Sequence, residues 1–203
     1  MDVSAQAAQK AQGLIRQSRR DTATAVRRFA DVIGRCDVSG MMPAWLNLDS
    51  EFALAQALRA VSRLESVHPK MRERFLGFWI KHGDAIRCSV NDDLILIDAL
   101  RKLLPPYEGP GLTLYRGDSA FNRRRRTYGI SWTRDKGIAR DFAMGIWQTF
   151  EGGSVLLAVD APAPAIIARD GGRDDGEQEY LVDRRRLKGI LAIERFAQRP
   201  TQQ

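Results

Sequence analysis

The chain has little cysteine and little histidine. Its two cysteines, Cys36 and Cys88, lack the CxxC spacing of a zinc site and the paired pattern of a disulfide framework. Two thiols in a chain of 203 residues are typical of buried free cysteines in a reducing compartment. The two histidines, His68 and His82, have no Ser, Cys or acid near them in a triad pattern, so neither is a candidate for that chemistry.

Long apolar runs and common nucleotide signatures are missing as well. The first twenty residues have no apolar segment of a secretory signal, and no run of about 18 apolar residues could span a membrane. No GxGxxG or Walker loop is present, and Asp92-Asp93 and Asp174-Asp175 lack companions at metal-ligand spacing. We therefore expect a cytoplasmic protein, of its own cell or of a target cell if it is delivered as an effector, with no metal and no membrane contact.

What the chain has in excess is positive charge. The formal net charge is +7 and the isoelectric point is near 9.8. A basic surface favours phosphate groups, whether of nucleic acid, of anionic lipid or of a phosphorylated cofactor. The net charge does not show which of these ligands is bound, and many basic proteins bind none of them. The hydrophobic fraction of 44% is ordinary for a globular protein.

A proline- and glycine-rich stretch, residues 105–111, divides the chain, because Pro-Pro and Gly-Pro-Gly cannot continue a helix. Helical periodicity precedes this stretch and short β-type runs follow it. We expect an α+β protein with a helical lobe over residues 1–104 and a mixed β-sheet core over residues 110–198, which can pack as one domain.

Capping residues and apolar spacing place the expected elements. About four helices are expected in the first half, from helical segments near 5–18, after a cap at Asp21 and Thr22, after Asp49 with Phe52 on its apolar face, after Pro69, and from Asn91. Strands are expected in the second half over 112–115, 128–133, 154–159, 165–168, 180–182 and 187–196. A helix capped by Asp135 is expected between the second and third strands, with Ala139 and Ala143 on its apolar face.

Three short motifs in the second half stand out together. They are Tyr115-Arg116-Gly117 at the end of an apolar strand, Ser131-Trp132-Thr133 on a strand, and Glu177-Gln178-Glu179 before an apolar strand. Each alone is weak, since strand residues of these types are usually structural. In this order they resemble the arginine–serine–glutamate class of mono-ADP-ribosyltransferases, whose fold many bacterial toxins share. The resemblance covers about residues 110–196 and implies that NAD⁺ is the co-substrate.

The resemblance implies a role for each motif residue. Arg116 contacts NAD⁺, and a guanidinium fork suits phosphate and ribose oxygens. Ser131 supports the catalytic glutamate and the nicotinamide ribose, and Thr133 lies on the same strand face because side chains alternate. Gly117 and Phe142 belong to the implied NAD-binding set. Trp132 points to the opposite face of the strand and is expected in the core.

The two glutamates have different implied roles. NAD⁺ cleavage passes through an oxocarbenium-like state, as glycoside cleavage does. Glu179 binds the ribose 2′-hydroxyl and stabilises the developing charge, and Glu177 orients or deprotonates the acceptor. This motif implies a protein arginine as acceptor, although a nucleic acid would suit the basic charge, and water would give simple NAD⁺ hydrolysis. A catalytically silent partner-binding module is a further alternative.

Two features fall outside the resemblance. Only fourteen residues separate Arg116 from Ser131, and we expect a loop carrying Arg123–Arg126 there, where many relatives have a helix. This run is either a solvated loop or a contact for the NAD⁺ phosphates or the acceptor. The helical half resembles no known family. Because an NAD-consuming enzyme endangers its own cell, an inhibitor or antitoxin protein is an expected partner.

Overall fold

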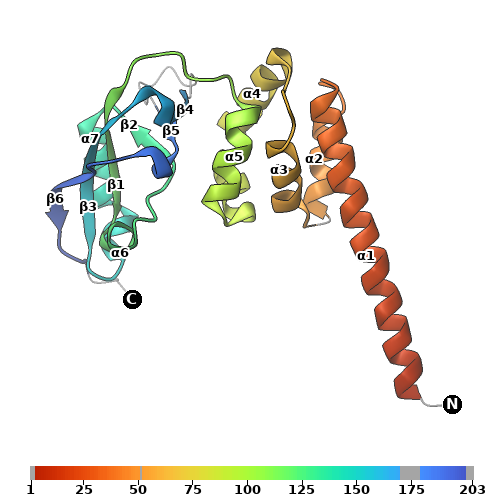
Figure 1. Ribbon diagram of the computed structural model, residues 1–203. Coiled ribbons are helices and arrows are strands. Elements are labelled where there is room, and N and C mark those ends of the chain that lie inside the picture. Colours follow the sequence, from red (N-terminus) through yellow and green to blue (C-terminus); the bar gives the residue numbers. More distant parts are fainter. Residues whose placement is uncertain (1–2, 51, 170–178, 200–203) are drawn as a thin grey trace. The chain divides into compact units, whose positions relative to one another are not determined.

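The computed structural model describes residues 3–50, 52–169 and 179–199. The chain forms two compact units, Met1–Leu104 and Pro105–Gln203, which we call the helical unit and the sheet unit. Figure 1 shows the helices of the first and the sheet of the second. Among the described residues, no helix combines the length and the apolar character needed to cross a lipid bilayer.

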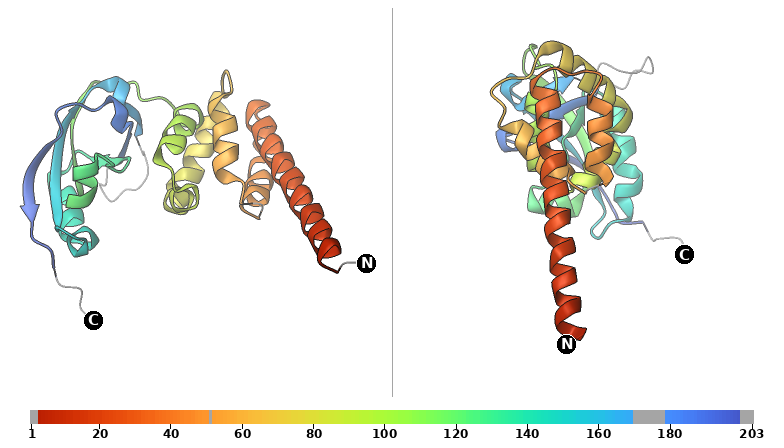
Figure 2. Two further views of the ribbon diagram at one scale, coloured as in Figure 1. Left: turned by 60° about the horizontal axis from the view of Figure 1, so that its bottom comes forward. Right: turned by 90° about the vertical axis from the view of Figure 1, so that its right-hand side faces the viewer.

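The helical unit contains five helices among its described residues. They are α1 (Val3–Gly34), α2 (Met41–Ser50), α3 (Leu54–Ser62), α4 (Pro69–Val90) and α5 (Asp93–Leu103). Helix α1 is continuous, so the prediction of a new helix capped by Asp21 was wrong: the Asp21 carboxylate accepts a hydrogen bond from Gln17 Nε2 one turn earlier at 2.9 Å. Figure 2 shows the N-terminal part of α1 extending past the other helices of this unit.

Local chemistry sets the ends of the later helices. Pro69 is the first residue of α4, as predicted, and its fixed φ suits that position. Asn91 ends α4 in the left-handed region instead of starting α5, which Asp92 caps by accepting from the N–H groups of the next turn. Phe52, expected on the apolar face of α3, precedes that helix with a φ of 51° and is 96% exposed.

An aromatic cluster fills the core of the helical unit. The Trp45 ring lies edge-on against Phe29, Phe75 and Phe78, with ring centroids 5.8, 6.4 and 4.8 Å apart. Both cysteines lie in this unit as free thiols, but Cys36 is half-buried and Cys88 is exposed, so the prediction that they are buried was wrong. The apolar stripes of the helices, which include Phe29, Phe75 and Phe78, form the core of this unit, as expected.

The sheet unit contains a six-stranded sheet among its described residues, in the order β4-β5-β2-β1-β3-β6. The strands are β1 (Leu112–Ser119), β2 (Ser131–Thr133), β3 (Ser154–Ala161), β4 (Ile166–Arg169), β5 (Glu179–Val182) and β6 (Leu191–Phe196). Helices and a sheet together confirm the predicted α+β class. Every described strand pair is antiparallel, so the prediction of a mixed sheet was wrong.

Two helices of the sheet unit are important for the site. Helix α6 (Ala120–Arg125) begins where β1 ends, and Ser119 caps it by accepting from Asn122 N. The Arg123–Arg126 segment is therefore mainly helical, and the predicted loop was wrong. Helix α7 (Lys136–Met144) is capped by Asp135, as predicted. Its Ala139 and Ala143 are buried, which agrees with the predicted apolar face.

Candidate active site

The three strands that carry the sequence motifs are neighbours in the sheet. Strand β2 lies between β1 and β5, although about 45 residues separate β2 from β5 along the chain. Figure 1 shows β1, β2 and β5 side by side. The sheet therefore brings the strands of Arg116, Ser131 and Glu179 together, which no local interaction in the sequence could do.

The strand register places three predicted site residues on one face. Thr133 pairs with Glu179 across β2 and β5, and Ser131 pairs with Leu181. Residues directly opposite each other in an antiparallel pair share a face, and so do residues two apart in a strand. Ser131, Thr133 and Glu179 therefore line the same face, and each is half-buried.

The opposite face of these strands is apolar. Trp132 pairs with Tyr180, and the two residues are 2% and 3% exposed. Both belong to the core cluster that also contains Leu114 and Leu157. The prediction that Trp132 packs in the core is confirmed. This core fixes the β2–β5 pair and, with it, the position of Glu179.

Helix α7 covers the face that carries Ser131 and Thr133. The Thr133 hydroxyl accepts a hydrogen bond from Asp135 N at 3.0 Å, so the end of β2 is tied to the start of α7. Phe142, on the same helix, is 57% exposed and does not belong to the core. Phe142 is thus exposed on the surface of α7.

The contact between α7 and β1 requires a glycine at position 117. A Cβ atom on Gly117 would overlap the backbone nitrogen of Ala143 and the backbone oxygen of Ala139. Backbone atoms cannot rotate away as the end of a flexible side chain can. Gly117 therefore allows the helix to approach the strand next to the motif residues.

We expect Gly117→Ala to destabilise the sheet unit by about 1–3 kcal/mol, since α7 must shift away from β1. Thermal unfolding of the whole chain measures the change. Gly77→Ala in α4 is the matched control, because nothing lies within 4 Å of the added methyl group. In a helix this control change is expected to stabilise by about 0.5–1 kcal/mol. Equal effects of the two changes would contradict the close contact at Gly117.

Arg116 points to the core face, opposite Glu179, because it precedes Gly117 and follows Tyr115, which pairs with Thr133. Its side chain is 8% exposed. Arg116 Nε donates to the Asp118 carboxylate at 2.8 Å, and Arg116 Nη1 donates to the Ser131 carbonyl oxygen at 2.6 Å. The guanidinium therefore clamps β1 to the motif segment of β2.

Asp118 is the residue that sequence reasoning missed. It is fully buried, and besides Arg116 its carboxylate accepts from Ser119 N and Asn122 Nδ2 at 2.8 Å each and from Gly129 N at 3.4 Å. A buried charge is stable when it is paired and hydrogen-bonded in this way. The signal in the sequence was an acid two residues after Arg116, hence on the same strand face.

The structure therefore brings together part of the predicted site. Ser131, Thr133 and Glu179 share one face, while the Arg116 guanidinium lies on the other and reaches only the backbone of Ser131. Glu177 lies outside the described residues. Among the described residues, no group of three or more His, Cys, Asp or Glu side chains is arranged to hold a metal ion.

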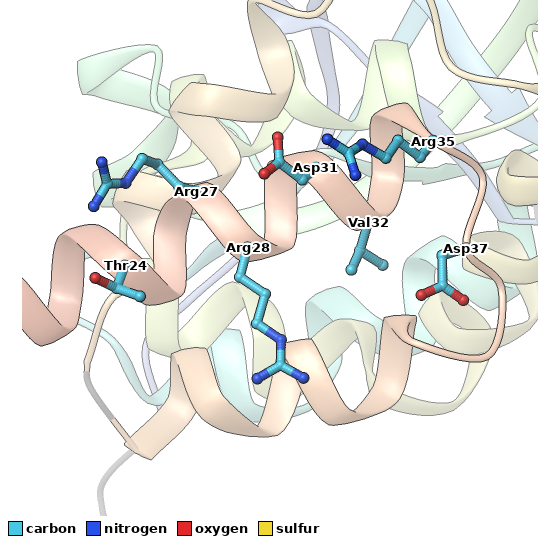
Figure 3. Close-up of a pocket in the computed structure, with 7 residues that line it drawn as sticks. All are labelled: Thr24, Arg27, Arg28, Asp31, Val32, Arg35 and Asp37. Carbon is cyan, nitrogen blue, oxygen red and sulfur yellow. The ribbon is translucent and has the colours of Figure 1, made fainter.

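The helical unit has an open hollow of about 510 Å³ along α1 and the turn after it. Figure 3 shows Arg27, Arg28 and Arg35 around it, together with Asp31 and Asp37. Hydrogen bonds from Ser39 and from Gly40 N hold the pKa of Asp37 below its usual range. The charges in this hollow are thus mixed, and Asp37 is engaged in the turn before α2.

Comparisons of the chain with protein-family models, with curated proteins and with solved structures give no match.

Proposed function

We propose that the sheet unit is the catalytic core of a mono-ADP-ribosyltransferase. The enzyme cleaves the nicotinamide–ribose bond of NAD⁺ and transfers ADP-ribose to a macromolecular acceptor. The observation that carries the proposal is the cross-strand pairing of Thr133 with Glu179, on the face that Ser131 shares. Two hydroxyls and a carboxylate on adjacent strands suit a ribose, whose hydroxyl groups donate and accept hydrogen bonds.

Glu179 supplies the central chemistry in this proposal. Its carboxylate binds the 2′-hydroxyl of the nicotinamide ribose and stabilises the positive charge that develops at the anomeric carbon as nicotinamide leaves. Nicotinamide departs as a neutral molecule and needs no general acid. Glu179 is half-buried, and its pairing with Thr133 fixes its backbone against β2.

Ser131 and Phe142 complete the NAD⁺ side of the proposal. Ser131 lies two residues from Thr133 on the same face and can hydrogen-bond the ribose or the Glu179 carboxylate. The exposed ring of Phe142 on α7 offers an apolar surface to the planar nicotinamide. Gly117 allows α7 to lie close to β1, so the helix that carries Phe142 stays close to the sheet that carries Ser131.

Arg116 acts as a positioning residue in this structure. Its bond to the Ser131 carbonyl fixes the backbone of the strand that presents Ser131 and Thr133. Direct contact with an NAD⁺ phosphate, which the sequence resemblance implies, requires the guanidinium to leave part of its bonding with Asp118. Arg116→Lys keeps the positive charge and loses the guanidinium fork. Measuring whether this variant still binds NAD⁺ distinguishes the two roles.

The acceptor defines the finer part of the function. The E-x-E resemblance favours an arginine of a protein, which Glu177 would orient or deprotonate. Nucleic acid is the second candidate, and the arginine-rich helix α6 is the observation that favours it.

Labelling of a cell lysate tests the transfer directly. With NAD⁺ labelled in its adenylate phosphate, we expect acid-insoluble label that appears with the wild-type chain and not with Glu179→Gln. Label that protease releases identifies a protein acceptor, and label that nuclease releases identifies a nucleic acid. Nicotinamide release without any insoluble label would contradict transfer and leave hydrolysis of NAD⁺ as the reaction.

A further inference from the structure

Seven arginines of the sheet unit occur in two runs, Arg123–Arg126 and Arg184–Arg186. The first run lies on α6 and its C-terminal cap, and the second forms a short 3₁₀ helix, η3 (Arg184–Arg186), after β5. Arg184 Nη1 donates to the carbonyl oxygen of Tyr128 at 3.0 Å, two residues after the first run ends. The fold thus brings both runs to the end of the sheet where β1 ends and β2 begins.

Most of these arginines are exposed. Arg124, Arg125 and Arg126 are exposed, and within the described part of the chain no carboxylate lies within ion-pair distance of them. In η3, the buried carboxylate of Asp183 accepts from Arg185 at 2.9 Å and lies 3.8 Å from Arg186. A surface of this kind attracts a polyanion.

An exposed aromatic ring lies within the basic surface. Phe121 is 38% exposed on α6, and the guanidinium carbon of Arg125 lies 4.4 Å from the centre of its ring. The guanidinium of Arg125 lies over the ring, and both groups offer a nucleobase a surface on which to stack. Base stacking on aromatic rings and on arginine is how proteins hold unpaired strands without reading their sequence.

We propose that this face, which we call the arginine face and define by Phe121, Arg123–Arg126 and Arg184–Arg186, binds single-stranded nucleic acid. The exposed arginines contact the phosphates, and the Phe121–Arg125 stack takes an unpaired base. Charge alone would favour a duplex, whose phosphates are denser, whereas a stacking platform needs bases that are free to unstack. The inference goes beyond the proposed activity and does not depend on it.

Fluorescence anisotropy of the full chain with a labelled oligouridylate tests the inference. We expect Arg124→Ala/Arg125→Ala/Arg126→Ala to bind at least about tenfold more weakly, and the slope of log K against log salt to fall by about 2, since each phosphate contact on a single strand contributes about 0.7. Phe121→Leu, which keeps the apolar contact and removes the π face, is expected to lose about tenfold. Far-UV circular dichroism checks the fold of each variant.

Two controls make the outcomes decisive. Arg16→Ala/Arg19→Ala/Arg20→Ala removes the same charge from exposed positions of α1 in the other unit, and we expect it to leave binding within about twofold of wild type. Glu179→Gln is expected to bind as wild type does, so loss of the proposed activity does not affect this test. Equal loss from both arginine triples, tighter binding of a matched duplex, or full competition by phosphatidylserine vesicles would overturn the inference.

Discussion

Glu179→Gln is expected to lower the rate of NAD⁺ cleavage by about 10²–10³-fold, with a much smaller change in KM. The change removes the negative charge and keeps the shape of the side chain. A preorganised charge that stabilises the transition state more than the bound substrate contributes about this much to kcat. Chromatographic measurement of released nicotinamide at several NAD⁺ concentrations gives kcat and KM separately.

Glu194→Gln is the matched control for this experiment. Glu194 lies on edge strand β6 and pairs with Arg140 and Lys136 of α7, away from the β5–β2–β1 centre of the sheet. Exposed ion pairs contribute little to stability, so this variant is expected to keep the wild-type rate. The proposed function fails if Glu179→Gln also keeps that rate, or if the two glutamine variants lose activity equally.

Asp118→Ala is expected to destabilise the sheet unit by about 3–5 kcal/mol. The change leaves the buried Arg116 guanidinium without its partner, which is the costly way to break a buried ion pair. It also removes the acceptor of three further donors, those of Ser119, Asn122 and Gly129. Urea unfolding of the whole chain, followed by hydrogen exchange at β1 and β2 amides, measures the loss and locates it.

A double variant distinguishes a simple ion pair from the wider network. Replacing both members of a buried pair by apolar residues is often neutral, because no charge is left behind. Arg116→Met/Asp118→Leu is nevertheless expected to remain unstable, because the donors on Ser119, Asn122 and Gly129 still lack an acceptor.

Asp160→Ala serves as the surface control for the Asp118 variants. The Asp160 carboxylate accepts one exposed hydrogen bond from Thr113 at 2.7 Å, so this loss is expected to stay below about 1 kcal/mol.

Full recovery of stability in the double variant Arg116→Met/Asp118→Leu would contradict this expectation of a wider network. It would show that Asp118 serves only to pair Arg116.

Local patterns in the sequence predicted many elements correctly. Asp135 caps α7 and Pro69 starts α4 because both effects depend on hydrogen bonds or dihedral angles within one turn. Where two local signals competed, the prediction failed. Asn91 and Asp92 are both capping residues, and only the left-handed conformation of Asn91 shows that one helix ends there before the next begins. Asp21 also has capping chemistry, yet α1 continues through it.

The sequence by itself determined the residue types of the candidate site and their alternation along strands. Ser131 and Thr133 share a strand face, and Trp132 lies on the other, because side chains alternate in any strand. Tertiary structure decided the rest. The pairing of Thr133 with Glu179, the burial of Arg116 against Asp118 and the joining of the two arginine runs through Tyr128 depend on contacts between residues distant in the chain. Strand order and register are set by the sheet as a whole, so no local pattern encodes them.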